Sequence, residues 1–129
     1  MKFIVTKNLE ELSEVMCQLM LKHMHTSKER TNIAITTGST CVKGYEKLAQ
    51  QVQGKSYFDP VHYYIFDEFW FWDEAHQKQE SVCRISLDAK YFTAAKVKDD
   101  HIHDLDMENY QTFDEDIQQI GGFDMAIMG

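Results

Sequence analysis

Two short polar segments contain the residue types that could do chemistry. Asp67 and Glu68 are adjacent carboxylates, and they directly follow the apolar run 61–66. Two adjacent carboxylates destabilise a folded protein unless they are solvated, paired with positive groups or used in a reaction. A carboxylate at this place could move a proton at a carbon next to a carbonyl group. A solvated acidic start of a loop explains the pair equally well, so the local sequence leaves both interpretations open.

The second segment is the turn 36–40, which joins the short apolar run 33–35 to a helical pattern. A small, flexible turn exposes backbone N–H groups and hydroxyls toward one point, and the dipole of the following helix adds positive potential. This combination suits a phosphate monoester. The candidate phosphate-binding residues are Thr37, Gly38, Ser39 and Thr40. The alternative is an ordinary strand–helix turn in which Ser39 or Thr40 caps the helix. The turn matches neither nucleotide-binding glycine motif, so we predict no nucleotide.

An aromatic run, Phe69-Trp70-Phe71-Trp72, follows the two carboxylates. Aromatic walls exclude water and could raise the pKa of a carboxylate. Four contiguous aromatic residues are also typical of a core or a subunit contact, and this second interpretation is favoured.

The cysteines and histidines give weaker signals. Cys17, Cys41 and Cys83 match no zinc or C-x-x-C spacing. We predict a buried thiol at Cys17. A reactive thiol at Cys41, after the turn, is the less favoured alternative. His101 and His103 share a strand face without a third ligand in register, so no metal site is predicted; His62 is expected to be a satisfied strand histidine.

The elements that must position these residues alternate between strand and helix patterns. Strands are predicted at 3–5, 33–35, 61–66 and 123–128, with an extended piece at 101–103. Helices are predicted after Asn8, after Thr40 as far as Gly54, over 82–92, and from Asp106 to Gly121-Gly122, with a polar loop at 73–80. This order predicts a parallel sheet with helices on both faces, a Rossmann-like α/β fold in one domain over 1–129. The last apolar strand reaches Gly129, so we expect a sheet that is incomplete at its C-terminal side.

Composition limits the function classes. The chain has 129 residues, with 13 basic and 21 acidic residues and a net charge of −8. Residues 66–129 carry fifteen of the acidic residues and five of the basic ones. Such a chain repels a phosphate backbone, so we expect no nucleic-acid partner. No apolar run approaches the roughly 20 residues that span a bilayer, and the N-terminus has no signal-peptide pattern. We therefore expect a cytoplasmic protein without a membrane partner.

Taken together, the motifs resemble the glucosamine-6-phosphate deaminase/isomerase family, whose fold 6-phosphogluconolactonase shares. Thr37-Gly38-Ser39-Thr40 is similar to the family's Thr-Gly-Gly/Ser-Thr-Pro phosphate loop, with Cys41 where the family usually has Pro. Phe66-Asp67-Glu68-Phe69 is similar to the Met-Asp-Glu-Tyr element. Glu80-Ser81 resembles the start of the family's next helix, and 124–129 resembles the strand that leads into its active-site loop.

The resemblance implies a phosphosugar substrate and no cofactor. It implies that Gly38, Ser39 and Thr40 hold the phosphate, that Asp67 moves a proton between C1 and C2 through an enediol or enolamine, and that Glu68 is a supporting carboxylate. Glucosamine or galactosamine 6-phosphate would become a ketose 6-phosphate and ammonia. The family continues into Gly-Xaa-Gly-Xaa-Asp-Gly-His, whose histidine opens the sugar ring. The resemblance therefore covers the N-terminal half of a family member, and we expect the 129 residues alone to lack turnover.

Two other functions remain open from the sequence. A lactonase of the same fold would hydrolyse 6-phosphogluconolactone, although Asp-Glu-Phe and Glu-Ser-Val fit the isomerase branch better than the lactonase motifs. A non-catalytic phosphosugar-binding or assembly fragment is the other alternative. A homo-oligomer is expected in either case.

Overall fold

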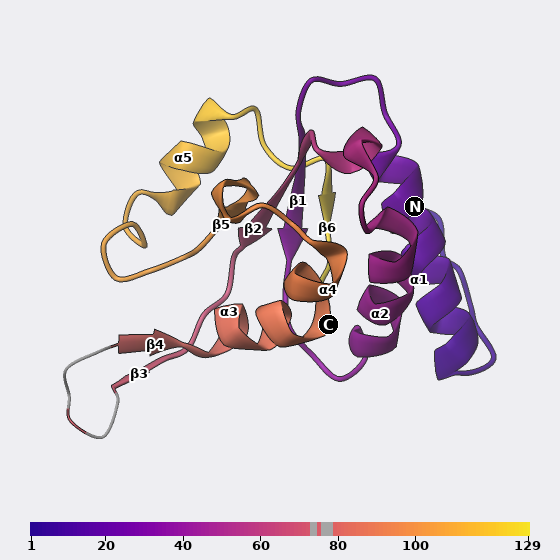
Figure 1. The fold of residues 1–129 in the computed structure, drawn as a ribbon, viewed down its shortest axis with the longest axis horizontal. Helices are drawn as coiled ribbons and strands as arrows, with labels where there is room; N and C mark the ends of the chain where they lie inside the picture. The colour runs from indigo at the N-terminus through magenta and orange to yellow at the C-terminus, as the bar shows by residue number, and fades with distance from the viewer. Residues whose placement is uncertain (73–74, 76–78) are drawn as a thin grey trace.

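The computed structural model describes residues 1–72, 75 and 79–129. Its main sheet has four parallel strands in the order β5-β2-β1-β6, and a separate antiparallel pair joins β3 to β4 (Figure 1). The strands are β1 (Thr31–Ile35), β2 (Val61–Ile65), β3 (Trp70–Trp72), β4 (Gln79–Ser81), β5 (Ile102–His103) and β6 (Met125–Ala126). The helices are α1 (Leu9–Met24), α2 (Val42–Val52), α3 (Val82–Leu87), α4 (Thr93–Ala95) and α5 (Phe113–Gln119). A π-helical turn, Asp88–Phe92, connects α3 to α4, and the three segments form one helix that we call the α3–α4 helix.

The larger core lies between one face of the sheet and three helices. Ile33, Ile35 and Ile65 project from β1 and β2 into a cluster with buried residues of α1, α2 and the α3–α4 helix. The helix α1 forms where its apolar spacing predicts it, because Asn8 accepts a hydrogen bond from the Glu11 backbone N–H at 2.9 Å and caps the first turn. The buried apolar face of the sheet holds these helices against β1 and β2, and so it stabilises the sheet edge at which the site lies.

The opposite face of the sheet has a thinner cover. Tyr64 and His103 lie on this face, and Phe113 of α5 and Ile120, which directly follows α5, line the same cavity of about 500 Å³. Figure 1 shows α5 on one side of the sheet and α1 and α2 on the other. The predicted parallel α/β sheet with helices on both faces is therefore confirmed. In the described part of the chain, no helix has the length and apolar character needed to cross a bilayer.

Two predicted elements are wrong. Residues 3–5 form no strand: Phe3 is 78% exposed and Val5 91% exposed, and this three-residue run pairs with no described strand. The fourth helix begins at Phe113 and not after Asp106. The Asp106 carboxylate instead accepts hydrogen bonds from the backbone N–H groups of Glu108 and Asn109, both at 2.8 Å, and so closes a local turn that competes with the helix.

The aromatic run is not part of the core, which was one of the two placements in the favoured interpretation of core or subunit contact. Phe69 is 69% exposed and Trp72 is 57% exposed. Trp70–Trp72 pairs with Gln79–Ser81 in an arm that extends away from the main sheet (Figure 1). The alternative interpretation as a subunit contact stays a prediction. Of the polar loop predicted at 73–80, residues 73–74 and 76–78 lie outside the described residues, while 79 and 80 belong to β4.

Three histidines stack beside the thinly covered face. The ring of His62 lies 4.3 Å from that of His101 and 5.1 Å from that of His103, and His62 Nδ1 lies 2.8 Å from His103 Nε2. Burial, the positive charge of Arg30 and the two neighbouring histidines lower the pKa of His62 to about 4, although Asp100 opposes them. His62 is thus a satisfied strand histidine, as predicted. In the described residues no group of three or more His, Cys, Asp or Glu side chains is placed to hold a metal ion.

This stack predicts acid-sensitive folding. Between pH 6.5 and about 4 the unfolded chain binds a proton at His62 that the folded chain does not. The free energy of unfolding should therefore fall as pH drops through this window, by about 1 to 2 kcal/mol in total. Urea unfolding at several pH values measures it. His62→Gln should flatten the dependence, and the exposed-site control His23→Gln should not. Equal slopes in wild type and His62→Gln would contradict this account.

Candidate functional site

The site candidates lie where the strand order reverses. From β1 the chain moves to β2 and then to β5, and it returns to place β6 on the other side of β1. Ligands of open parallel sheets bind outside the carboxyl ends of strands at such a switch point. The turn 36–40 follows β1 and the pair 67–68 follows β2, so the parallel pairing of these strands brings the two predicted segments to the same edge.

The phosphate-loop candidates have an open geometry. Ser39 and Thr40 are exposed, and Thr37 and Gly38 are partly exposed. The Cys41 N–H donates to the Gly38 carbonyl at 3.2 Å, which closes the turn just before α2 begins at Val42. No side-chain hydrogen bond caps α2, and its first turn has no acidic residue. The helix end therefore keeps its uncompensated positive potential, which favours an anion.

One hydroxyl of the loop already has a protein partner. Thr37 Oγ1 lies 3.7 Å from Cys83 Sγ, at the start of the α3–α4 helix. The hydroxyls of Ser39 and Thr40 make no hydrogen bond to described residues in this structure. Ser39 and Thr40 are therefore the better candidates for direct phosphate contact, and Thr37 anchors the loop to the neighbouring helix.

Asp67 points back toward the end of β1. Thr36 Oγ1 lies 2.8 Å from Asp67 Oδ1 and 2.9 Å from Asp67 Oδ2, so the threonine hydroxyl donates to this carboxylate. The contact joins the segment that contains the phosphate-loop candidates to the proposed base. Thr36 lies in the turn 36–40 that the sequence singled out, but its contact with Asp67 was not predicted, because nothing in the local pattern links residues 31 positions apart.

Glu68 points the other way, to the first turn of the α3–α4 helix. Its Oε1 accepts hydrogen bonds from the backbone N–H groups of Phe69 at 2.8 Å and Cys83 at 2.7 Å, and its Oε2 accepts from that of Arg84 at 3.1 Å. A carboxylate at a helix N-terminus satisfies orphan N–H groups and complements the helix dipole. The two adjacent carboxylates are therefore used differently: Asp67 faces the loop, and Glu68 holds a helix.

This arrangement predicts different effects for two substitutions at Glu68. Glu68→Ala leaves the three N–H groups without their acceptor and should lower the free energy of unfolding by about 1 to 2 kcal/mol. Glu68→Gln keeps one acceptor oxygen and should cost about half as much. Urea unfolding measures both, with the exposed Glu46→Ala as control. If Glu68→Ala cost no more than Glu46→Ala, the helix-holding role would be wrong.

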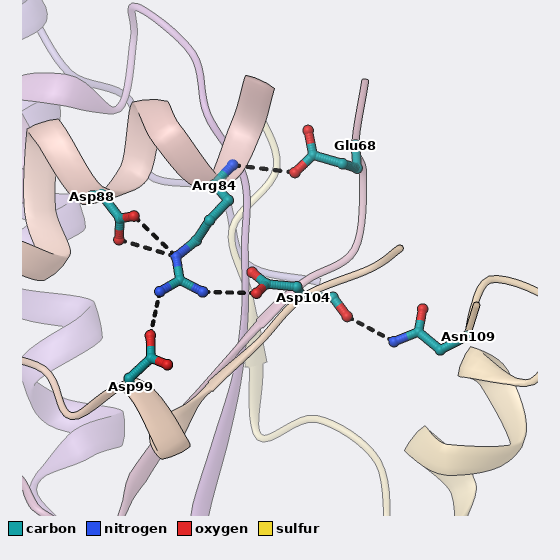
Figure 2. A network of polar contacts seen from close by, with 6 residues as sticks. All are labelled: Glu68, Arg84, Asp88, Asp99, Asp104 and Asn109. Atoms are coloured by element: carbon teal, nitrogen blue, oxygen red, sulfur yellow. Dashed lines mark hydrogen bonds and ion pairs between the residues drawn. The ribbon is translucent and has the colours of Figure 1, made fainter. Parts of the chain in front are cut away.

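Arg84, whose backbone N–H donates to Glu68, extends this support to other elements (Figure 2). Its guanidinium donates to Asp104 Oδ2 at 2.7 Å, to Asp88 Oδ1 at 3.0 Å and to Asp99. The Asp104 carbonyl in turn accepts from the side-chain amide of Asn109 at 2.8 Å. Burial opposes the charge of Arg84, but the hydrogen bonds to the three aspartates outweigh it and raise its pKa. Arg84 thus links the α3–α4 helix, whose first turn binds Glu68, to the loop that follows β5.

The cysteines and the aromatic run add no reactive side chain to this geometry. All three cysteines are buried free thiols, which confirms the prediction for Cys17. Burial raises the pKa of the Cys41 thiol, which is the opposite of what a reactive thiol needs. The exposed rings of Phe69 and Trp72 do not form the water-excluding wall that was considered beside Asp67.

Comparisons with known proteins bear on the family resemblance and on the fold. No protein-family model matches the sequence. Glucosamine-6-phosphate deaminase of Clostridium botulinum (strain Alaska E43 / Type E3) is 26% identical over 137 aligned positions, which cover all of this chain and 53% of the relative. Glucosamine-6-phosphate deaminase of Thermoanaerobacter sp. (strain X514) is also 26% identical, with 52% of the relative covered. The chain therefore spans about half the length of the curated relatives it matches.

A solved structure supports the fold assignment. A monomeric glucosamine-6-phosphate deaminase, described as a missing link of the NagB superfamily, superposes with a TM-score of 0.75 at 17% identity. The match covers 95% of this chain and 52% of that one. Through its curated relatives and its fold, the resemblance of this chain to the glucosamine-6-phosphate deaminases is confirmed, over a length that fits the N-terminal half of such a protein.

Proposed function

We propose that this chain forms part of an amino-sugar phosphate isomerase/deaminase, which converts glucosamine or galactosamine 6-phosphate to a ketose 6-phosphate and ammonia. One observation carries the proposal: the turn 36–40, which can bind an anion, and the Asp67 carboxylate lie at the ends of adjacent strands. Within this turn, Thr36 donates a hydrogen bond to Asp67. The curated relatives named glucosamine-6-phosphate deaminase support the same assignment.

The loop would hold the substrate through its phosphate. The backbone N–H groups at Gly38, Ser39 and Thr40 and the exposed hydroxyls of Ser39 and Thr40 can donate to phosphate oxygens, and α2 adds its dipole. Because the chain carries a net charge of −8, this local attraction must supply the binding of a dianion. Fixing the phosphate orients the sugar carbons relative to Asp67.

Asp67 would act as the proton-transfer base. In the open-chain aldose form, Asp67 takes the proton from C2, the released electron pair forms the C1–C2 double bond of an enolamine, and the C1 carbonyl oxygen takes up a proton. Asp67 then returns its proton to C1, and C2 becomes an imine. Water hydrolyses this imine to the ketone of the product and ammonia. Glu68 would position the helix beside the site, since its three hydrogen bonds with described residues all go to backbone N–H groups.

The experiment is an ammonia-release assay on the full-length protein with glucosamine 6-phosphate and galactosamine 6-phosphate. The proposal predicts stoichiometric ammonia and ketose 6-phosphate from at least one of them. Acid production from 6-phosphogluconolactone, without ammonia from either amino sugar, would replace the proposal with the lactonase. Phosphosugar binding with neither reaction would replace it with the non-catalytic alternative.

The expected homo-oligomer stays a prediction. The arm at Phe69–Trp72 exposes three aromatic side chains, which is the kind of surface that a subunit contact covers. Sedimentation equilibrium of wild type and a Phe71→Ser variant tests whether the arm contributes.

A further inference from the structure

We propose that Thr36 is a positioning residue, which holds the carboxylate of Asp67 in the orientation that proton transfer requires. This inference rests on the proposed function, because it concerns the same site. Thr36 was not among the candidate residues drawn from the sequence, and it precedes the phosphate-loop motif.

The contact is close and directed. Thr36 Oγ1 lies 2.8 and 2.9 Å from the two oxygens of Asp67, and 3.3 Å from the carbonyl oxygen of Thr37. A hydroxyl has one proton to donate, and an ionised acceptor makes the shorter and stronger hydrogen bond. The hydroxyl of Thr36 is therefore committed to Asp67. A carboxylate has about four lone-pair sites, so most of its acceptor capacity remains for a proton from substrate.

Thr36 is itself held in place. Its side chain belongs to a residue that is only 4% exposed, and the buried Tyr45 of α2 donates its hydroxyl to the Thr36 carbonyl at 2.7 Å. Burial raises the pKa of Tyr45 far above its usual value, so the phenol stays protonated and can donate. Tyr45, Thr36 and Asp67 thus form a series that connects α2, the end of β1 and the end of β2.

Strand pairing does not need this contact. The parallel register of β1 and β2 runs over five residue pairs and ends at Ile35 opposite Ile65. Thr36 and Asp67 lie beyond that last pair, where the backbone ladder has stopped. A hydrogen bond there contributes little to holding the strands together, but it removes rotational freedom from the Asp67 side chain. Fixing a reacting group before substrate arrives lowers the cost of reaching the reactive geometry.

The test compares two substitutions of nearly the same size. Thr36→Val keeps the shape and removes the donor, whereas Thr36→Ser keeps the donor. In the full-length protein, Thr36→Val should lower kcat for ammonia release about tenfold to a hundredfold with KM nearly unchanged, since Asp67 does not hold the phosphate. Thr36→Ser should stay within about threefold of wild type. Thermal unfolding of both variants shows whether the fold is retained.

A second measurement needs no turnover. The ¹³C resonance of the Asp67 carboxyl carbon, assigned with Asp67→Asn, reports the hydrogen bond directly. It should move in Thr36→Val and keep the wild-type position in Thr36→Ser. An unchanged resonance in folded Thr36→Val, or equal kcat in wild type and Thr36→Val, would overturn the positioning role. A different outcome is that the resonance moves in Thr36→Val but wild type releases no ammonia from either amino sugar. In that case the hydrogen bond between Thr36 and Asp67 stands, but the proposed function is wrong. The catalytic role of that hydrogen bond is then wrong as well.

Discussion

Asp67→Asn in the full-length protein should release ammonia from glucosamine 6-phosphate about a thousandfold more slowly than wild type. An amide cannot accept the proton that, in the proposed mechanism, the carboxylate would take from C2, and general bases typically contribute a hundredfold to ten-thousandfold. The amide oxygen can still accept the hydrogen bond from Thr36, so the substitution preserves the local contact. The loss should therefore appear in kcat, with KM and the thermal unfolding midpoint close to wild type.

A matched control separates this effect from a general loss of negative charge. Asp114 is exposed on α5, far along the chain from the turn and from Asp67. Asp114→Asn changes the net charge by the same amount and should leave kcat unchanged. If Asp67→Asn kept more than about a tenth of wild-type kcat, Asp67 would not be the base.

Arg84→Met should give the largest loss of folding stability. The guanidinium is the shared partner of Asp88, Asp99 and Asp104 (Figure 2). Without it, three carboxylates stay close together, and the partly buried Asp104 loses its only hydrogen-bonded cation among the described residues. Burial, together with the negative charges of Asp88 and Asp99, raises the pKa of Asp104 despite Arg84, so the ionised form of Asp104 is already disfavoured. Breaking such a pair from one side is strongly destabilising, and we expect a loss of about 2 to 3 kcal/mol.

A double substitution tests this cause. Arg84→Met with Asp104→Asn removes the stranded charge as well as the cation, and it should recover about half of the loss measured for Arg84→Met alone. Urea unfolding of the wild type, both single variants and the double variant gives the coupling. Purely additive effects of the two substitutions would show that the loss comes from side-chain packing and not from the charge of Asp104.

Most of the helices and strands could be predicted from the sequence, because they depend on local patterns. The capping of α1 by Asn8 and the apolar runs of β1 and β2 are local, and the structure places them as expected. Residues 3–5 have the same apolar character, but only a neighbouring strand could have made them a strand. The start of α5 was missed because Asp106 could cap either a helix or a turn, and its contacts with Glu108 and Asn109 select the turn.

The sequence predicts where the candidate site lies, but it does not predict which of its residues contact one another. Small residues after one strand and carboxylates after the next predict an edge site, because parallel strands end together. The partners of those carboxylates lie far away in the chain. Thr36 is 31 residues from Asp67, and two of the three N–H groups that Glu68 binds are 15 and 16 residues from it. No local pattern distinguishes Asp67 from Glu68 in role, whereas the directions of their hydrogen bonds do.

Solvent deuterium exchange tests the central claim most directly, since it follows the carbon-bound proton itself. The full-length protein is incubated with glucosamine 6-phosphate or fructose 6-phosphate in D₂O, and deuterium at C2 of the amino sugar and C1 of the ketose is followed by NMR. If Asp67 moves a proton between C1 and C2, wild type either incorporates solvent deuterium at these carbons or carries a deuteron placed at C2 of the substrate to C1 of the product, and Asp67→Asn does neither. Wild type that shows neither solvent incorporation nor C2-to-C1 transfer, or equal rates in both proteins, would contradict the claim that this strand edge is a proton-transfer site for phosphosugars.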